Sequence, residues 1–69
     1  MTPVMLRQIW SLVEDAQATM ILNQDDPSLV EWLLNQLREQ RSLANEEVEI
    51  ISHYLRARTP LIREIAATH

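Results

Sequence analysis

The sequence predicts an all-α fold, a small bundle of three helices with a short C-terminal fourth. Apolar residues recur at spacings of three and four along most of the chain, which is the helical pattern. No stretch alternates between apolar and polar residues as a half-buried strand does. Each of the three prolines follows a residue that can cap a helix. At 69 residues, the chain is expected to form a single domain over residues 1–69.

The first helix is expected over residues 3–22, and it carries more apolar surface than one helix face can bury. Its core-facing seam alternates spacings of three and four residues and comprises Leu6, Ile9, Val13, Ala16 and Met20. Further apolar side chains flank this seam, namely Met5, Trp10, Leu12 and Ile21. Together they exceed the apolar stripe of roughly 100° that a helix needs to cover a core. We therefore expect part of this surface to contact a second copy of the chain or another protein.

The prolines indicate where helices begin, because proline suits the first helical position and the residue before it can cap free backbone N–H groups. The three pairs are Thr2-Pro3, Asp26-Pro27 and Thr59-Pro60. The second helix is expected over residues 27–40, with Leu29 and Trp32 on its flanks. Its inward residues are Val30, Leu33, Leu34 and Leu37. The short connection at residues 23–26 predicts that the first two helices form an antiparallel helical hairpin at the N-terminus.

The third helix is expected to begin after a cap at Asn45 and to run toward Thr59-Pro60. Two outcomes are open at that pair. The helix can end there, leaving residues 61–65 in a short fourth helix, or it can continue with a kink that costs roughly 3 kcal/mol. We expect the break, because it avoids that cost, and we expect residues 66–69 to fray.

Composition excludes several classes of function. The chain has no glycine, which removes the phosphate-binding loops of nucleotide-dependent enzymes. It has no cysteine, so it can form neither a disulfide nor a thiolate zinc site, and this fits a reducing cytoplasm. No secretory signal pattern is seen at the N-terminus, and no apolar run reaches the roughly 18 residues of a membrane-spanning helix. We expect a soluble cytoplasmic protein that does not bind membranes.

The residue types that support catalysis or metal binding do not form a complete site. Glu49 and His53 stand four apart on one helix face, but a zinc site needs at least three protein ligands. Ser52 and His53 are adjacent, and adjacent side chains on a helix point about 100° apart. We therefore expect no enzyme activity, no metal and no cofactor.

DNA binding is the alternative function, because the second and third helices with their short connection can be interpreted as a helix-turn-helix. The net charge of −4 argues against it, since a basic surface is the expected footprint of a nucleic-acid-binding protein. The helix that would read DNA begins with Glu46 and Glu47, which would repel phosphates. We therefore expect nucleic acid not to be the partner.

Three segments resemble those of small uncharacterised α-helical proteins found in cyanobacteria. They are LRQIWSLVE at residues 6–14, SLVEWLL at residues 28–34 and PLIREIA at residues 60–66. The likeness extends over most of the chain and contains no chemical motif. It implies a bacterial cytoplasmic protein without a catalytic role.

The favoured interpretation is a non-catalytic protein–protein interaction or regulatory module that forms a homodimer through its first helix. Tryptophan is a frequent anchor at interfaces, because it brings a large apolar body and one hydrogen-bond donor. The expected apolar contacts are Met5, Trp10, Leu12 and Trp32. The expected rim charges are Arg38, Arg41, Arg56 and Arg63. The identity of any other protein partner does not follow from the sequence.

Overall fold

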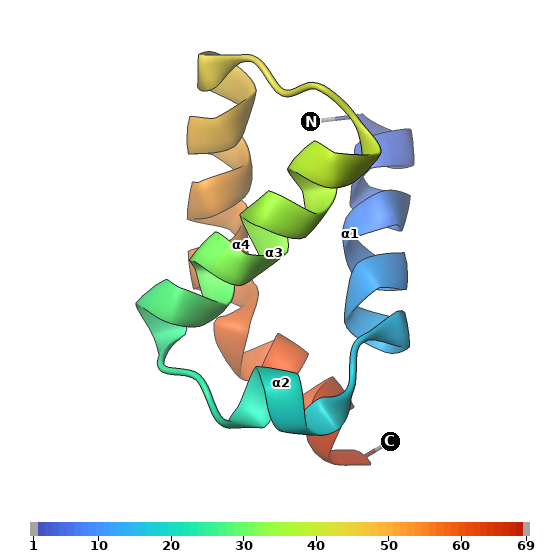
Figure 1. Cartoon of the computed structure of the whole chain (residues 1–69), viewed down its shortest axis with the longest axis vertical. Helices are drawn as coiled ribbons and strands as arrows, with labels where there is room; N and C mark the ends of the chain where they lie inside the picture. The colour runs from blue at the N-terminus through green and yellow to red at the C-terminus, as the bar shows by residue number, and fades with distance from the viewer. Residues whose placement is uncertain (1, 69) are drawn as a thin grey trace.

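The computed structural model describes residues 2–68, and these residues form four helices and no strand. Helix α1 spans Pro3–Asp15, α2 spans Ala18–Leu22, α3 spans Asp26–Gln40 and α4 spans Asn45–Thr68. Helix α3 crosses in front of α4 and ends near the start of α1, while α2 lies beside the C-terminal half of α4 (Figure 1). The prediction of an all-α fold is therefore confirmed, but the short helix is the second and not the last.

The core takes side chains from all four helices. Its buried apolar residues are Met5, Ile9, Val13, Ile21, Leu29, Val30, Leu33, Leu34, Leu37, Ile51, Leu55, Ile62 and Ala66. The accessible surface of the chain is 4632 Å². A compact monomer of 8.1 kDa exposes about 4,500 Å², so the chain is folded as tightly as its mass predicts. A second copy is not needed to complete this core.

The expected first helix is interrupted, because Ala16 and Gln17 have extended backbone with ψ angles of 146° and 136°. A straight helix of 20 residues would be about 30 Å long and would span the whole 31 Å molecule. The break lets the chain turn back over the core. It also brings fully buried Ile21 inward and leaves Met20, which we expected in the core-facing seam, 43% exposed. The prediction of one helix over residues 3–22 is wrong, and α2 is inserted between α1 and α3, which still pack against each other.

Helix α3 matches the predicted second helix closely. Its cap, however, is Asp25, whose Oδ1 accepts a hydrogen bond from the Ser28 backbone N–H at 2.9 Å. Asp26, the expected cap, is the first helical residue. Leu29, expected on a flank, is fully buried. The expected cap at Thr2 is confirmed, since its side chain accepts from the Met5 N–H at 3.2 Å.

Helix α4 continues through Pro60, so the expected break and the short C-terminal helix are wrong. The ribbon of α4 changes direction along its length (Figure 1), as a proline inside a helix causes. Thr59 did not act as a cap: it is buried, and its hydroxyl donates to the Leu55 carbonyl at 2.8 Å. Pro60 and Arg56 are both exposed, so water can solvate the Arg56 carbonyl that loses its helical partner.

The two ends of α4 also differ from expectation. Asn45 is the first helical residue, and the turn before it is closed by Glu47, whose Oε1 accepts from the Ala44 N–H at 3.1 Å. Residues 66–68 do not fray but belong to α4, because Ala66 packs into the core at 5% exposure. The expectation for residue 69 lies outside the described part of the chain.

Candidate functional site

An aromatic pair joins α1 to α4 on one side of the bundle. The rings of Trp10 and Tyr54 meet edge to face, with centroids 6.3 Å apart and planes at 78°. The indole Nε1 of Trp10 donates a hydrogen bond to the Tyr54 hydroxyl at 3.1 Å. The guanidinium of Arg58 lies over the Tyr54 ring, 5.4 Å from its centroid. Both rings remain partly exposed, so the pair presents aromatic surface to solvent.

Further apolar residues lie near the aromatic pair on the same two helices. Leu6 stands one helical turn before Trp10, and Ile50 stands one turn before Tyr54. Leu61 follows Tyr54 two turns further along α4. Ile50 is 52% exposed and Leu61 is 44% exposed. We call this surface the α1–α4 face and define it by Leu6, Trp10, Ile50, Tyr54 and Leu61.

Of the four apolar contacts expected from the sequence, one belongs to the α1–α4 face. Trp10 lies at its centre. Met5 is 3% exposed and packs in the core, so the expectation that it would contact a partner is corrected. Leu12 and Trp32 are half-buried and pack against the core. Trp10 and Trp32 are therefore both half-buried by residues of their own chain, without a second copy.

The four arginines expected at an interface rim have different roles. Arg63 is tied to the chain itself: it forms an ion pair with Asp26 at 2.7 Å and donates to the Ile21 and Gln24 carbonyls at 3.2 and 2.7 Å. Its donors therefore serve the fold, and its expected role as a rim charge stays a prediction. Arg38 and Arg56 are exposed. The fourth, Arg41, is exposed and lines a cavity.

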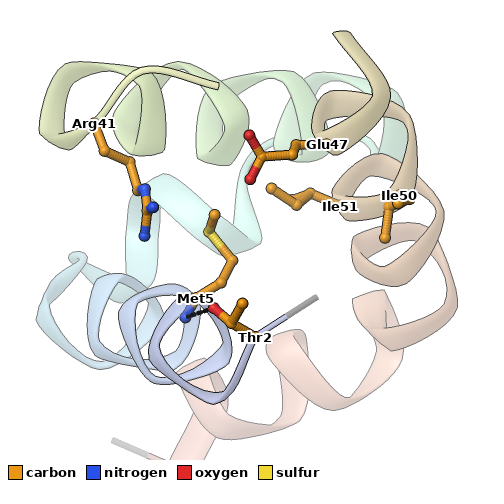
Figure 2. Close-up of a pocket in the computed structure, with 6 residues that line it drawn as sticks. All are labelled: Thr2, Met5, Arg41, Glu47, Ile50 and Ile51. Atoms are coloured by element: carbon orange, nitrogen blue, oxygen red, sulfur yellow. Dashed lines mark hydrogen bonds between the residues drawn. The ribbon is translucent and has the colours of Figure 1, made fainter. Parts of the chain in front are cut away.

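This cavity has a volume of about 130 Å³ and lies where the start of α1, the end of α3 and the start of α4 meet. Its lining comprises Thr2, Met5, Arg41, Glu47, Ile50 and Ile51. In Figure 2 the Arg41 guanidinium and the Glu47 carboxylate extend toward the Met5 side chain from different elements. The cavity thus combines an apolar floor with one positive and one negative group.

The residues considered for catalysis lie elsewhere. Glu49, Ser52 and His53 line an open groove between α3 and α4, together with Glu31 and Arg56 among others. His53 is exposed. Within residues 2–68, no three His, Cys, Asp or Glu side chains gather as a metal site would require.

Sequence reasoning missed most of the α1–α4 face. In the sequence, Ile50 and Tyr54 stand beside the expected inward stripe of this helix, which is Val48, Ile51 and Leu55. This pattern alone does not distinguish a second core face from an exposed one. Leu61 was assigned to a separate helix because Pro60 was expected to end α4. The signal that could have found the face is the run 50, 54, 57 and 61 of apolar positions at spacings of three and four.

In the part of the chain that the structure describes, no helix is both long enough and apolar enough to cross a membrane. Comparisons with protein-family models, with curated proteins and with solved structures find no match to the chain. The resemblance to small cyanobacterial proteins therefore stays a prediction.

Proposed function

We propose that the protein is a non-catalytic protein–protein interaction module that self-associates through the α1–α4 face. The observation that supports this most directly is the exposure of Ile50 and Leu61 on either side of the Trp10–Tyr54 pair. A partly exposed aromatic centre bordered by aliphatic residues is the composition of the core of a protein interface. This replaces the first helix alone as the proposed contact surface.

A homodimer interface would cover the α1–α4 face and the surface around it. A standard interface buries about 800 Å² on each partner, which is roughly a sixth of the 4632 Å² that this chain exposes. A two-fold axis through the face would place the same residues of both copies against each other. Each copy carries a net charge of −4, and Arg58 beside Tyr54 brings positive charge to the contact. Because the copies repel each other overall, added salt should strengthen their association.

We place this module in the bacterial cytoplasm as part of the same proposal. A chain without cysteine suits a reducing compartment, where disulfides do not form. The three segments that resemble cyanobacterial helical proteins support a bacterial source.

Sedimentation equilibrium over a wide concentration range tests the proposal. We expect the unaltered chain to approach twice the monomer mass as concentration rises. The dimer dissociation constant should be lower in about 0.5 M salt than in about 0.1 M salt. Ile50→Glu and Leu61→Glu should each weaken dimerisation at least tenfold, because they place a charge in the apolar contact. Trp10→Ala is a poorer test, since removing Trp10 also removes its contact with Tyr54 within the chain.

The matched control is Leu22→Glu. Leu22 lies on α2 and is 42% exposed, so this substitution adds the same charge to a comparable residue outside the face. The dimer dissociation constant of Leu22→Glu should equal that of the unaltered chain. A chain that stays monomeric at every concentration would contradict the proposal. So would a Leu22→Glu variant whose dimerisation is weakened as much as that of Ile50→Glu. A titration with mixed-sequence DNA at low salt tests the alternative function, and we expect no binding.

A further inference from the structure

The cavity at the end of the bundle has a floor that suits a small apolar group. Met5 and Ile51 are 3% and 1% exposed, while Ile50 forms a wall that is open to solvent. A cavity of about 150 Å³ lined by aliphatic and aromatic residues can take up benzene, which has six carbon atoms. The volume here, about 130 Å³, is therefore enough for an aliphatic side chain of three or four carbons.

Arg41 places a positive charge at the mouth of this cavity. Its Nη1 donates to Gln8 Oε1 at 3.3 Å, which holds the guanidinium between α1 and α3. A guanidinium has five N–H donors in a planar fork that matches the two oxygens of a carboxylate. The ion pair found within residues 2–68 joins Arg63 to Asp26 and not Arg41 to any carboxylate. Most of the donors of Arg41 are therefore available to a ligand.

Glu47 places a negative charge at the same cavity. One carboxylate oxygen, Oε1, accepts from the Ala44 N–H, which fixes the side chain at the start of α4. The residue is half-buried, so its charge is less screened by water than that of an exposed glutamate. The other carboxylate oxygen can accept a hydrogen bond from a ligand ammonium group.

We propose that this cavity binds a small aliphatic α-amino acid with a side chain the size of that of valine or leucine. The ligand carboxylate would pair with Arg41, its ammonium group with Glu47, and its side chain would contact Met5 and Ile51. In an α-amino acid, the ammonium group, the carboxylate and the side chain are all bonded to the α carbon. The cavity likewise has two opposite charges beside one apolar floor. A ligand with a carboxylate alone would be attracted by Arg41 and repelled by Glu47. Ile50 belongs both to this cavity and to the α1–α4 face, so Met5 and Ile51 are the residues that report on the cavity alone.

Methyl NMR on the full chain tests this inference. We would label the isoleucine and methionine methyl groups and titrate the protein with L-leucine. The signals of Met5, Ile50 and Ile51 should shift and saturate in the millimolar range. The signal of Ile62 should not move, because Ile62 is fully buried and lies roughly 16 Å further along α4. A titration in which the three cavity signals never saturate would overturn the inference.

Two analogues of leucine test the roles of the charges on the unaltered protein. N-acetylleucine lacks the ammonium charge and leucinamide lacks the carboxylate, and each should bind at least tenfold more weakly than leucine. Glycine, which has no side chain to fill the floor, should also bind at least tenfold more weakly. Equal binding of leucine and N-acetylleucine would show that Glu47 takes no part and would overturn the proposal.

Two substitutions test the protein side. Arg41→Gln removes the positive charge, and Glu47→Gln removes the negative charge but keeps an oxygen that can accept from Ala44. Each should weaken leucine binding at least tenfold, while Arg38→Gln, an exposed arginine one turn earlier on α3, should leave it unchanged. Leucine binding that is unaffected by both cavity substitutions would overturn the assignment. The analogue titrations decide the question if either variant does not fold.

Discussion

Arg63 and Asp26 lie 37 residues apart in the sequence, and Arg63 Nη2 donates to Asp26 Oδ1 at 2.7 Å. The same guanidinium donates to the backbone carbonyls of Ile21 and Gln24. These acceptors lie at the end of α2, in the turn that follows it and at the start of α3. One side chain of α4 therefore holds the turn between α2 and α3, which contains no glycine.

The first prediction concerns this contact. Arg63→Ala should lower the free energy of unfolding by about 2 kcal/mol, because hydrogen bonds to a charged group contribute roughly 1.5–3 kcal/mol when partly shielded from water. The Arg63 side chain is 27% exposed, so the middle of that range is expected. Urea unfolding followed by far-UV circular dichroism would measure the change.

Two further variants separate the ion pair from the backbone contacts. The Asp26 side chain is 67% exposed, so Asp26→Asn should cost less than about 1 kcal/mol. Arg56→Ala, an exposed arginine two turns earlier on α4, should cost less than about 0.5 kcal/mol. If Asp26→Asn lowered the free energy of unfolding as much as Arg63→Ala does, the contacts of Arg63 with the Ile21 and Gln24 carbonyls would not be its main stabilising interactions.

The role of Arg63 shows where sequence reasoning stops. Helical periodicity predicted the all-α class and the inward residues of α3, because those depend on local spacing. The partner of Arg63 depends on the break at Ala16 and Gln17, which turns α2 toward α4. No local rule predicted that break, since Ala and Gln are good helix formers. Without it, Arg63 was interpreted as a surface charge and Met20 as a core residue.

The second prediction concerns Pro60. The prediction of a break at Pro60 is wrong because it considered only the local cost of proline. It left out the core contacts of Leu55 and Ile62, which lie on either side of Pro60 and are fully buried. Pro60→Ala should raise the free energy of unfolding by about 1–2 kcal/mol. The gain is below the roughly 3 kcal/mol cost of an internal proline, because proline also restricts the unfolded chain. Thermal and urea unfolding would measure it.

A control at a neighbouring exposed position shows whether the surrounding helix is intact. Ala57→Pro should destabilise the protein by about 3 kcal/mol, because α4 is a regular helix before Pro60. A loss of stability in Pro60→Ala would mean that the bend itself is required for the contact between α2 and α4.

The third prediction concerns the pH dependence of the cap of α3. Hydrogen bonds from the Ser28 side chain and its backbone N–H lower the pKa of the Asp25 carboxyl from its ordinary value, with a smaller contribution from Arg63. A carboxyl whose pKa is lower in the folded state stabilises the fold above its unfolded pKa of about 4. That stabilisation should disappear as the pH falls through the lowered value.

Asp25→Asn isolates this effect, because asparagine also caps helices well but carries no charge. The unfolding midpoint of the unaltered chain should exceed that of Asp25→Asn at pH 7, and the two midpoints should converge as the pH falls through the lowered pKa of Asp25. Glu31→Gln is the control, a substitution at an exposed site in the middle of α3. Its difference in unfolding midpoint from the unaltered chain should change less with pH than that of Asp25→Asn. A difference between Asp25→Asn and the unaltered chain that does not change with pH would contradict the role of the charge.

The fourth prediction concerns the Trp10–Tyr54 pair. Tyr54→Phe keeps the ring but removes the hydroxyl that accepts from Trp10 Nε1. It should cost about 1 kcal/mol, the net contribution of a typical hydrogen bond, as measured by urea unfolding of dilute protein. In a Trp10→Phe background the donor is already absent, so the same substitution should cost less than about 0.5 kcal/mol.

The difference between the two backgrounds is the coupling energy of the pair, and it should be about 0.5–1.5 kcal/mol. An equal cost in both backgrounds would mean that the Tyr54 hydroxyl is stabilised by water and not by Trp10. The result bears on the proposed interface, because a coupled pair is held rigid before a partner arrives. A rigid aromatic centre loses little side-chain entropy on binding, which favours association through the α1–α4 face.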